Sequence, residues 1–201
     1  MAKPYESDWR AVRDVLRYIK GTIGHGIKYS DHVEGDYGRN LIAYTDSDFA
    51  ADGSGRSTTG WIMLYNGRPF HWKTQLQKHT SLSSTEAEVI ALCALTKELS
   101  WIRLFLIEIG CLLSDEPALV LCDNTSAIKI VQSEGATQRT RHLKANLGYV
   151  REQVVNNEIE LMHVSSALQR ADMLTKGLPV AKFIANRDSL MVKVFDQAGW
   201  S

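Results

Sequence analysis

The middle of this 201-residue chain alternates between strand-like and helix-like patterns, and this alternation constrains the fold most. Three runs rich in β-branched and aromatic residues, LIAYTD (41–46), TTGWIMLY (58–65) and PFHWK (69–73), predict three strands. Asn66-Gly67 separates the last two runs, and this dipeptide is favoured in the type I′ turn of a hairpin. We therefore expect three consecutive strands that pair in an antiparallel manner.

A long helix and a strand–helix–strand series follow. Ser83 stands three residues before Glu86, the spacing of a capping box, and apolar residues then recur at helical spacing as far as Gly110. The runs ALVLC (118–122) and IELMHV (159–164) predict two more strands. Further helices are expected over 125–132, 141–155, 168–176 and 180–190. This order of elements predicts an α/β fold with a mixed sheet.

The N-terminal part has a different pattern. Residues 7–20 carry apolar side chains at helical spacing and predict an amphipathic helix that ends at Gly21. A short strand is expected near 26–30, and the polar stretch 31–40 resembles a linker. We place a boundary between two parts of the chain in this stretch.

Charge and composition say little about the chain as a whole. The 23 basic and 23 acidic residues cancel, and no apolar run approaches the roughly 20 residues that span a bilayer. Two stretches, 53–85 and 135–151, contain basic residues but no acid. Such segregation could neutralise phosphates on one face, although two solvated surface stretches would look the same. The basic residues concerned are Arg56, Arg68, Lys73, Lys78, Arg139, Arg141, Lys144 and Arg151.

Some polar and aromatic residues suggest simpler roles. The cysteines Cys93, Cys111 and Cys122 have no CxxC spacing and lie in apolar surroundings, which predicts buried thiols and no zinc site. Trp61 and Trp72 are most simply part of the core.

Acids at the ends of apolar strands are the candidate chemical site. Asp46 ends LIAYT and Asp123 ends ALVLC, so both carboxylates would meet at one edge of the sheet if these strands are neighbours. Glu88 in the long helix and Asp172 in a late helix could join them. Converging carboxylates need cations between them, and oxygen ligands favour Mg²⁺ or Mn²⁺. An Asp after a strand is also a common turn former or N-cap, so spacing alone leaves both interpretations open.

A series of long motifs then carries a resemblance. In this order, they are similar to the ribonuclease H domain of Ty1/copia retrotransposon polyproteins, over residues 1 to 190. The first 22 residues resemble the end of the preceding reverse transcriptase, which implies a reverse transcriptase tail over 1–38 and a ribonuclease H domain over 39–201. The motifs are YTDSDFAAD, GRSTTGW, HWKTQLQKHTSLSSTEAEVIAL, LCDNTSAI, RTRH (139–142), IELMHV and ADMLTKGLP.

The resemblance implies a ribonuclease H-like α/β fold, with a mixed five-stranded sheet flanked by helices, and a metal site of four acids. Asp46, Asp123 and Asp172 match the first, third and fourth acids. Either Glu86 or Glu88 could be the second, and we choose Glu88 because AEVIAL resembles the corresponding helix in retroviral enzymes. Further candidate roles are metal binding or a surface position for Asp48, and substrate binding for Asn124, Arg56, Lys73, Lys78, Arg139 and Arg141.

The implied activity is hydrolysis of the RNA strand of RNA/DNA hybrids by two Mg²⁺ ions, for which Mn²⁺ could substitute. The implied partners are the hybrid and the reverse transcriptase domain of the same polyprotein, without a membrane. The alternative is a catalytically silent fragment that binds hybrid or serves a structural role. The resemblance also implies an intracellular, cytoplasmic location in a virus-like particle, with nuclear access left open. Where many ribonucleases H carry a loop histidine, residues 165–168 have none.

Overall fold

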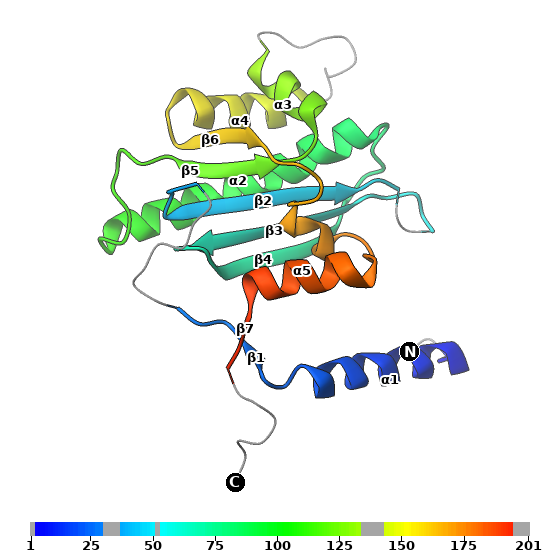
Figure 1. The fold of residues 1–201 in the computed structure, drawn as a ribbon. Helices are drawn as coiled ribbons and strands as arrows, with labels where there is room; N and C mark the ends of the chain where they lie inside the picture. The colour runs from blue at the N-terminus through cyan, green and yellow to red at the C-terminus, as the bar shows by residue number, and fades with distance from the viewer. Residues whose placement is uncertain (1–2, 30–36, 51–52, 134–142, 195–201) are drawn as a thin grey trace.

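A computed structural model describes residues 3–29, 37–50, 53–133 and 143–194 of the chain (Figure 1). Its centre is a five-stranded sheet in the order β4-β3-β2-β5-β6. Strand β2 pairs antiparallel with β3 and parallel with β5, so the sheet is mixed, as predicted. The strands are β2 (Leu41–Asp48), β3 (Thr58–Tyr65), β4 (Arg68–Leu76), β5 (Ala118–Cys122) and β6 (Ile159–His163).

Local sequence signals account for much of this sheet. The predicted run 58–65 coincides with β3, and 118–122 with β5. Asn66 and Gly67 both have positive φ angles, 49° and 76°, as a type I′ turn between β3 and β4 requires. Strand β2 continues two residues beyond Asp46, because its pairing with β3 extends to the Asp48–Thr58 pair. Asp46 therefore lies within the strand, opposite Gly60, rather than at its end.

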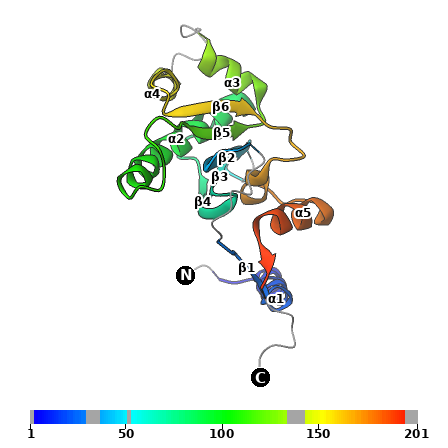
Figure 2. The same ribbon diagram turned by 60° about the vertical axis from the view of Figure 1, so that its left-hand side comes forward.

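Helices cover both faces of the sheet (Figure 2). On one face α2 (Ser84–Glu108), α3 (Thr125–Gln132) and α4 (Lys144–Val155) pack on alternate residues of the strands, such as Ala43 and Val120. On the other face, the 3₁₀ helix η2 (Arg170–Leu174) and α5 (Val180–Leu190) pack on the intervening residues, such as Tyr44 and Leu121. Because side chains alternate between the two faces along each strand, each strand contributes residues to two hydrophobic cores. This fold of a mixed five-stranded sheet flanked by helices is the one expected from the sequence.

Gly60 of β3 lies at a close contact between the sheet and the C-terminal end of η2. A Cβ atom at this position would lie 2.6 Å from Cγ2 of Thr175 and 3.0 Å from Cβ of Leu174. We expect Gly60→Ala to lower the free energy of unfolding by about 1–3 kcal/mol, the usual cost of overpacking. Gly148→Ala in α4 is the matched control: a Cβ atom there would have no neighbour within 4 Å, and the gain in helix propensity should stabilise the protein by about 1 kcal/mol. Urea unfolding of the two variants checks both signs.

The N-terminal elements lie outside the sheet and its two cores (Figure 1). Helix α1 (Glu6–Gly21) has no buried residue, and its apolar stripe is exposed. It is joined to the rest of the chain by a two-stranded ribbon of β1 (His25–Gly26) and β7 (Val192–Lys193), and by an edge-on contact of Tyr18 with Phe183 of α5. The residues of the stripe are Trp9, Val12, Val15, Leu16 and Ile19. The boundary after residue 38 stays a prediction, since residues 30–36 lie outside the described part.

Two predictions of burial are wrong. Trp61 is buried, but Trp72 is 53% exposed. Trp72 lies on the edge strand β4, opposite Ile62 of β3, where η2 and α5 cover the sheet only in part. Cys93 and Cys122 are buried, whereas Cys111 follows the end of α2 and is exposed. None of the helices in the described part of the chain combines the length and the hydrophobicity that crossing a lipid bilayer requires.

Candidate active site

Three aspartates from three separate elements converge at one edge of the sheet. Asp46 lies near the end of β2, and Asp123 directly follows β5, whose last residue Cys122 is in register with Thr45. Asp172 belongs to η2, which packs against β2 and β3. One carboxylate oxygen of each aspartate lies within 4.8 Å of the others. Parallel pairing of β2 and β5 therefore produces the juxtaposition that the sequence predicted.

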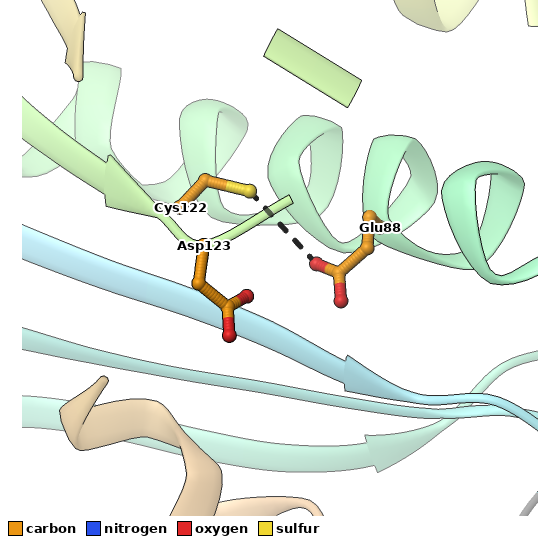
Figure 3. A group of neighbouring side chains, drawn as sticks. All are labelled: Glu88, Cys122 and Asp123. Atoms are coloured by element: carbon orange, nitrogen blue, oxygen red, sulfur yellow. Dashed lines mark hydrogen bonds between the residues drawn. The ribbon is translucent and has the colours of Figure 1, made fainter. Parts of the chain in front are cut away.

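Glu88 adds a fourth carboxylate from the first turns of α2. Ligand atoms of its carboxylate, the Cys122 thiol and the Asp123 carboxylate also lie within 4.8 Å of one another. Figure 3 shows these three side chains pointing toward one another. The backbone N–H of Ser47 donates to Oε1 of Glu88 over 3.2 Å, and the side chain is buried. The structure thus brings together all four acids that the sequence singled out.

Glu86, the other candidate for the second acid, has a different environment. Ser83 caps α2 by accepting a hydrogen bond from the backbone N–H of Glu86 over 3.2 Å. Oε2 of Glu86 accepts from the backbone N–H of Leu82 over 2.9 Å, one residue earlier than a capping box predicts. Glu86 therefore stabilises the start of the helix, and Glu88 is the glutamate that faces the aspartates.

Burial and mutual repulsion favour the protonated forms of two of these acids. Burial, followed by the charges of Asp46 and Asp123, raises the pKa of Glu88 to about 8. Burial also raises the pKa of Asp46, and the charges of Asp172 and Asp123 add to the effect. The pKa of the Cys122 thiol is raised far above its usual value, chiefly by burial and then by Glu88, so the sulfur is a neutral thiol and a poor metal ligand. When all four carboxyl groups are ionised, they form a set of oxygen donors with excess negative charge.

Two lysines partly compensate this charge, on the Asp172 side of the site. Nζ of Lys176 lies 2.7 Å from Oδ1 of Asp172 and 3.5 Å from Oδ2 of Asp46. Lys182 of α5 pairs with Oδ2 of Asp172. Although burial alone would raise the pKa of Asp172, the two lysines hold it below its usual value. Sequence reasoning missed both lysines; the only signal was the four-residue spacing of Asp172 and Lys176.

Hydroxyl groups hold two of the aspartates. Thr175 donates a hydrogen bond from Oγ1 to Oδ2 of Asp46. Oγ of Ser166 donates to Oδ2 of Asp123 over 2.7 Å, so the loop without a histidine contacts the site through a serine. Gln169 is buried and donates from Nε2 to the carbonyl of Thr45 over 2.9 Å, which ties η2 to the end of β2. No pattern in the sequence singled out these residues.

The residues present suit a hard divalent cation. Carboxylate oxygens are the ligands that Mg²⁺ and Mn²⁺ prefer, and here they come from rigid elements at the edge of one sheet. Oδ1 of Asp172 is buried, and its partner within the described part of the chain is the ammonium group of Lys176, 2.7 Å away. Such an oxygen, beside the carboxylates of Asp46 and Asp123, is suited to bind an ion.

The candidate substrate residues have varied environments. Asn124 is the N-cap of α3, because its Oδ1 accepts from the backbone N–H of Ala127 over 2.9 Å. Arg56 donates to Oγ of Ser54 over 2.8 Å. Lys73 is exposed and lies over the Trp61 ring, 5.2 Å from its centroid. Lys78 is exposed and lines a cavity of about 380 Å³ beside α2.

Three further candidates, Arg139, Arg141 and Asp48, are not among the residues of the described site. Arg139 and Arg141 lie outside the described residues. Asp48 is partly exposed at the end of β2 and is in neither group of neighbouring ligand atoms found among the described residues. Substrate contact stays a prediction for all of the basic candidates and for Asn124.

Comparison with known proteins identifies relatives of this chain. No protein-family model matches it. It is 36% identical over 186 residues to the retrovirus-related Pol polyprotein from transposon TNT 1-94 of Nicotiana tabacum, covering 91% of this chain and 13% of the relative. Identity to the Pol polyprotein from transposon RE2 of Arabidopsis thaliana is 35% over 184 residues, covering 91% of this chain and 12% of the relative. The chain thus spans about an eighth of the length of these curated relatives.

A more distant relative is also a retrotransposon polyprotein, and a solved structure has the same fold. The Ty1-JR1 Gag-Pol polyprotein of Saccharomyces cerevisiae is 27% identical over 146 residues, covering 71% of this chain and 8% of the relative. The solved structure of LC11-RNase H1, isolated from compost, superposes with a TM-score of 0.51 and 21% identity, covering 68% of this chain and 93% of that one. The superposition shows the ribonuclease H fold. The chain belongs to the Pol polyproteins of copia-type retrotransposons, as a segment with the ribonuclease H fold.

Proposed function

We propose that this segment is an endonuclease that hydrolyses the RNA strand of RNA/DNA hybrids with two divalent metal ions, Mg²⁺ or in its place Mn²⁺. One observation carries the proposal: Asp46, Glu88, Asp123 and Asp172 meet at one edge of a ribonuclease H fold, although they are far apart in the sequence. Two ions held by such a set are a recurring arrangement for phosphodiester hydrolysis.

Asp46 is central to the arrangement. One of its carboxylate oxygens lies within 4.8 Å of oxygens of both Asp172 and Asp123, so Asp46 would help to hold both ions, with Glu88 and Asp123 favouring one and Asp172 the other. When bound, the ions would ionise the attacking water and neutralise charge on the leaving 3′ oxygen. The protein supplies orientation: the Ser47 N–H holds Glu88, and Ser166 holds Asp123 before substrate arrives.

The surroundings support the proposed partners. Exposed basic side chains such as Lys73 and Lys78 could neutralise phosphates, and contacts with 2′-hydroxyls would distinguish the RNA strand. The apolar stripe of α1 would pack against the reverse transcriptase domain of the same polyprotein, since the relatives are far longer than this chain. The same membership supports a site of action within a cytoplasmic virus-like particle.

Cleavage of an end-labelled RNA/DNA hybrid by the isolated chain tests the proposal. We expect the RNA strand to be cut with MgCl₂ or MnCl₂. No cutting is expected with EDTA, because the carboxylates alone cannot activate the attacking water. Double-stranded DNA should not be cut to a comparable extent, because it lacks the 2′-hydroxyls of the RNA strand. Cleavage undiminished by EDTA would contradict the metal site.

The exposed stripe of α1 also supports the alternative, a fragment that is silent without its polymerase. Binding of the hybrid without cleavage would favour a silent binding module. Absence of binding would favour a structural fragment, and joining the chain to its reverse transcriptase domain should then restore both properties.

A further inference from the structure

Asp172 differs from the other acids of the site because both of its carboxylate oxygens face lysines. Lys176 lies 2.7 Å from Oδ1, and Lys182 donates a hydrogen bond to Oδ2. The two ammonium groups carry the same charge at similar distances from one carboxylate. They are, however, held in place in different ways.

Lys182 is fixed by the protein on both sides. Besides Asp172, its Nζ donates to the carbonyl of Ser166 over 2.7 Å. Helix α5, which carries it, is tied to the site by a 3.3 Å hydrogen bond from Nδ2 of Asn186 to the carbonyl of Gln169, and both of these residues are buried. Lys182 therefore fixes the orientation of the Asp172 carboxylate and connects it to the loop whose Ser166 hydroxyl holds Asp123.

Lys176, by contrast, is held by carboxylates of the candidate metal site and by no backbone group within the described part of the chain. Its Nζ lies between Oδ1 of Asp172 and Oδ2 of Asp46, at 2.7 and 3.5 Å. Both partners of Lys176 are thus acids of the candidate metal site, whereas Lys182 also donates to a backbone carbonyl. The Lys176 side chain is 36% exposed, which gives it a path to solvent. An ion shared by Asp46 and Asp172 would need the space that this ammonium group takes.

We propose that Lys176 is an internal placeholder cation between Asp46 and Asp172 that yields its position when a divalent ion binds, whereas Lys182 is a positioning residue that stays and orients Asp172 toward the ion. The inference rests on the metal site of the proposed function. Two cations cannot share one pair of carboxylates closely without strong repulsion, so Lys176, whose partners among the described residues are these two carboxylates, moves when a divalent ion binds to them. A lysine on its four-carbon stem can retreat without any change in the backbone.

Binding of Mn²⁺ to the hybrid-free protein, followed by calorimetry and by the electron paramagnetic resonance of free Mn²⁺, separates the two roles. Lys176→Met and Lys182→Met each remove one positive charge beside Asp172, so the general gain in attraction for Mn²⁺ is common to both. We expect Lys176→Met to bind Mn²⁺ about tenfold more tightly than wild type, as removal of a charge about 4 Å from the ion allows. Lys182→Met should bind about 10–100-fold more weakly, the usual loss when a group that orients a ligand is removed.

Lys129→Met, on the exposed surface of α3, is the matched control and should bind like wild type. Thermal unfolding in EDTA and with added MnCl₂ shows that each variant folds, and the rise in Tm on adding metal should be largest for Lys176→Met. Equal tightening by both variants would overturn the inference, since the lysines would then supply net charge alone, and so would unchanged affinity in both. If wild type and all variants bind no Mn²⁺, the metal site of the proposed function fails as well.

Discussion

Glu88→Gln is expected to abolish cleavage of the RNA/DNA hybrid while the protein still folds and binds it. The substitution keeps the size of a buried side chain but removes a charge that faces Asp123 and the N–H of Ser47. Loss of a residue that only orients a metal ligand costs about 10–100-fold in affinity or activity, so loss of a ligand itself should exceed about a hundredfold. Hybrid affinity should be unchanged or slightly higher, because one negative charge near the phosphates is gone. Single-turnover cleavage and filter binding measure the two quantities separately.

Glu86→Gln is the matched control two residues away on the same helix. Residues two apart in an α-helix point about 200° away from each other, so the two glutamates cannot serve the same ion pair. Glu86 accepts from the N–H of Leu82 at the start of α2, and the amide oxygen of Gln can accept the same hydrogen bond, so stability and the rate of cleavage should both change little. Loss of cleavage in Glu86→Gln with activity retained in Glu88→Gln would show that the second acid is misassigned.

Much of the fold could be predicted from the sequence because its signals are local. The hairpin at Asn66-Gly67 depends on a dipeptide, and the long helix on a cap and an apolar stripe that begin within a few residues of each other. Where a feature depends on a partner strand, prediction was less accurate. The extension of β2 to Asp48 reflects pairing with β3, and the exposure of Trp72 reflects what covers the edge strand β4.

The same distinction applies to the site. Asp46 and Asp123 could be located because each follows an apolar run, because neighbouring parallel strands end at one edge, and because the motifs around them resemble those of a known family. The groups that hold these acids could not be located in this way. Ser166 and Lys182 reach the site only through the path of the chain after β6, and polar residues in such segments carry no periodic signal.

Stability of the metal-free protein should fall as the pH rises from about 5 to about 8. The pKa of Glu88 is raised from 4.5 to about 8, mainly by burial, so within this window the folded protein holds a proton that the unfolded chain has lost. The free energy of unfolding then decreases with pH, by at most about 1.4 kcal/mol per pH unit, and levels off above the folded pKa. The raised pKa of Asp46 acts in the same direction. The lowered pKa of Asp172 acts oppositely, and the stability it contributes is lost only in acid, below its usual value of 3.8.

Urea unfolding in EDTA at a series of pH values measures this slope, and Glu88→Gln, which cannot ionise, should flatten it. A divalent ion replaces the bound proton, so MgCl₂ should stabilise wild type little near pH 5 and most near pH 8, where Glu88 ionises without an ion to compensate it. A flat profile in wild-type protein, or an equal slope in Glu88→Gln, would mean that Glu88 is not the buried acid that responds to pH. If Glu88 sets the slope, the charge that destabilises the metal-free protein near neutral pH is the same charge that attracts the metal ion. The stability of the metal-free protein should therefore fall, and its metal affinity should rise, as the pH increases from about 5 to about 8.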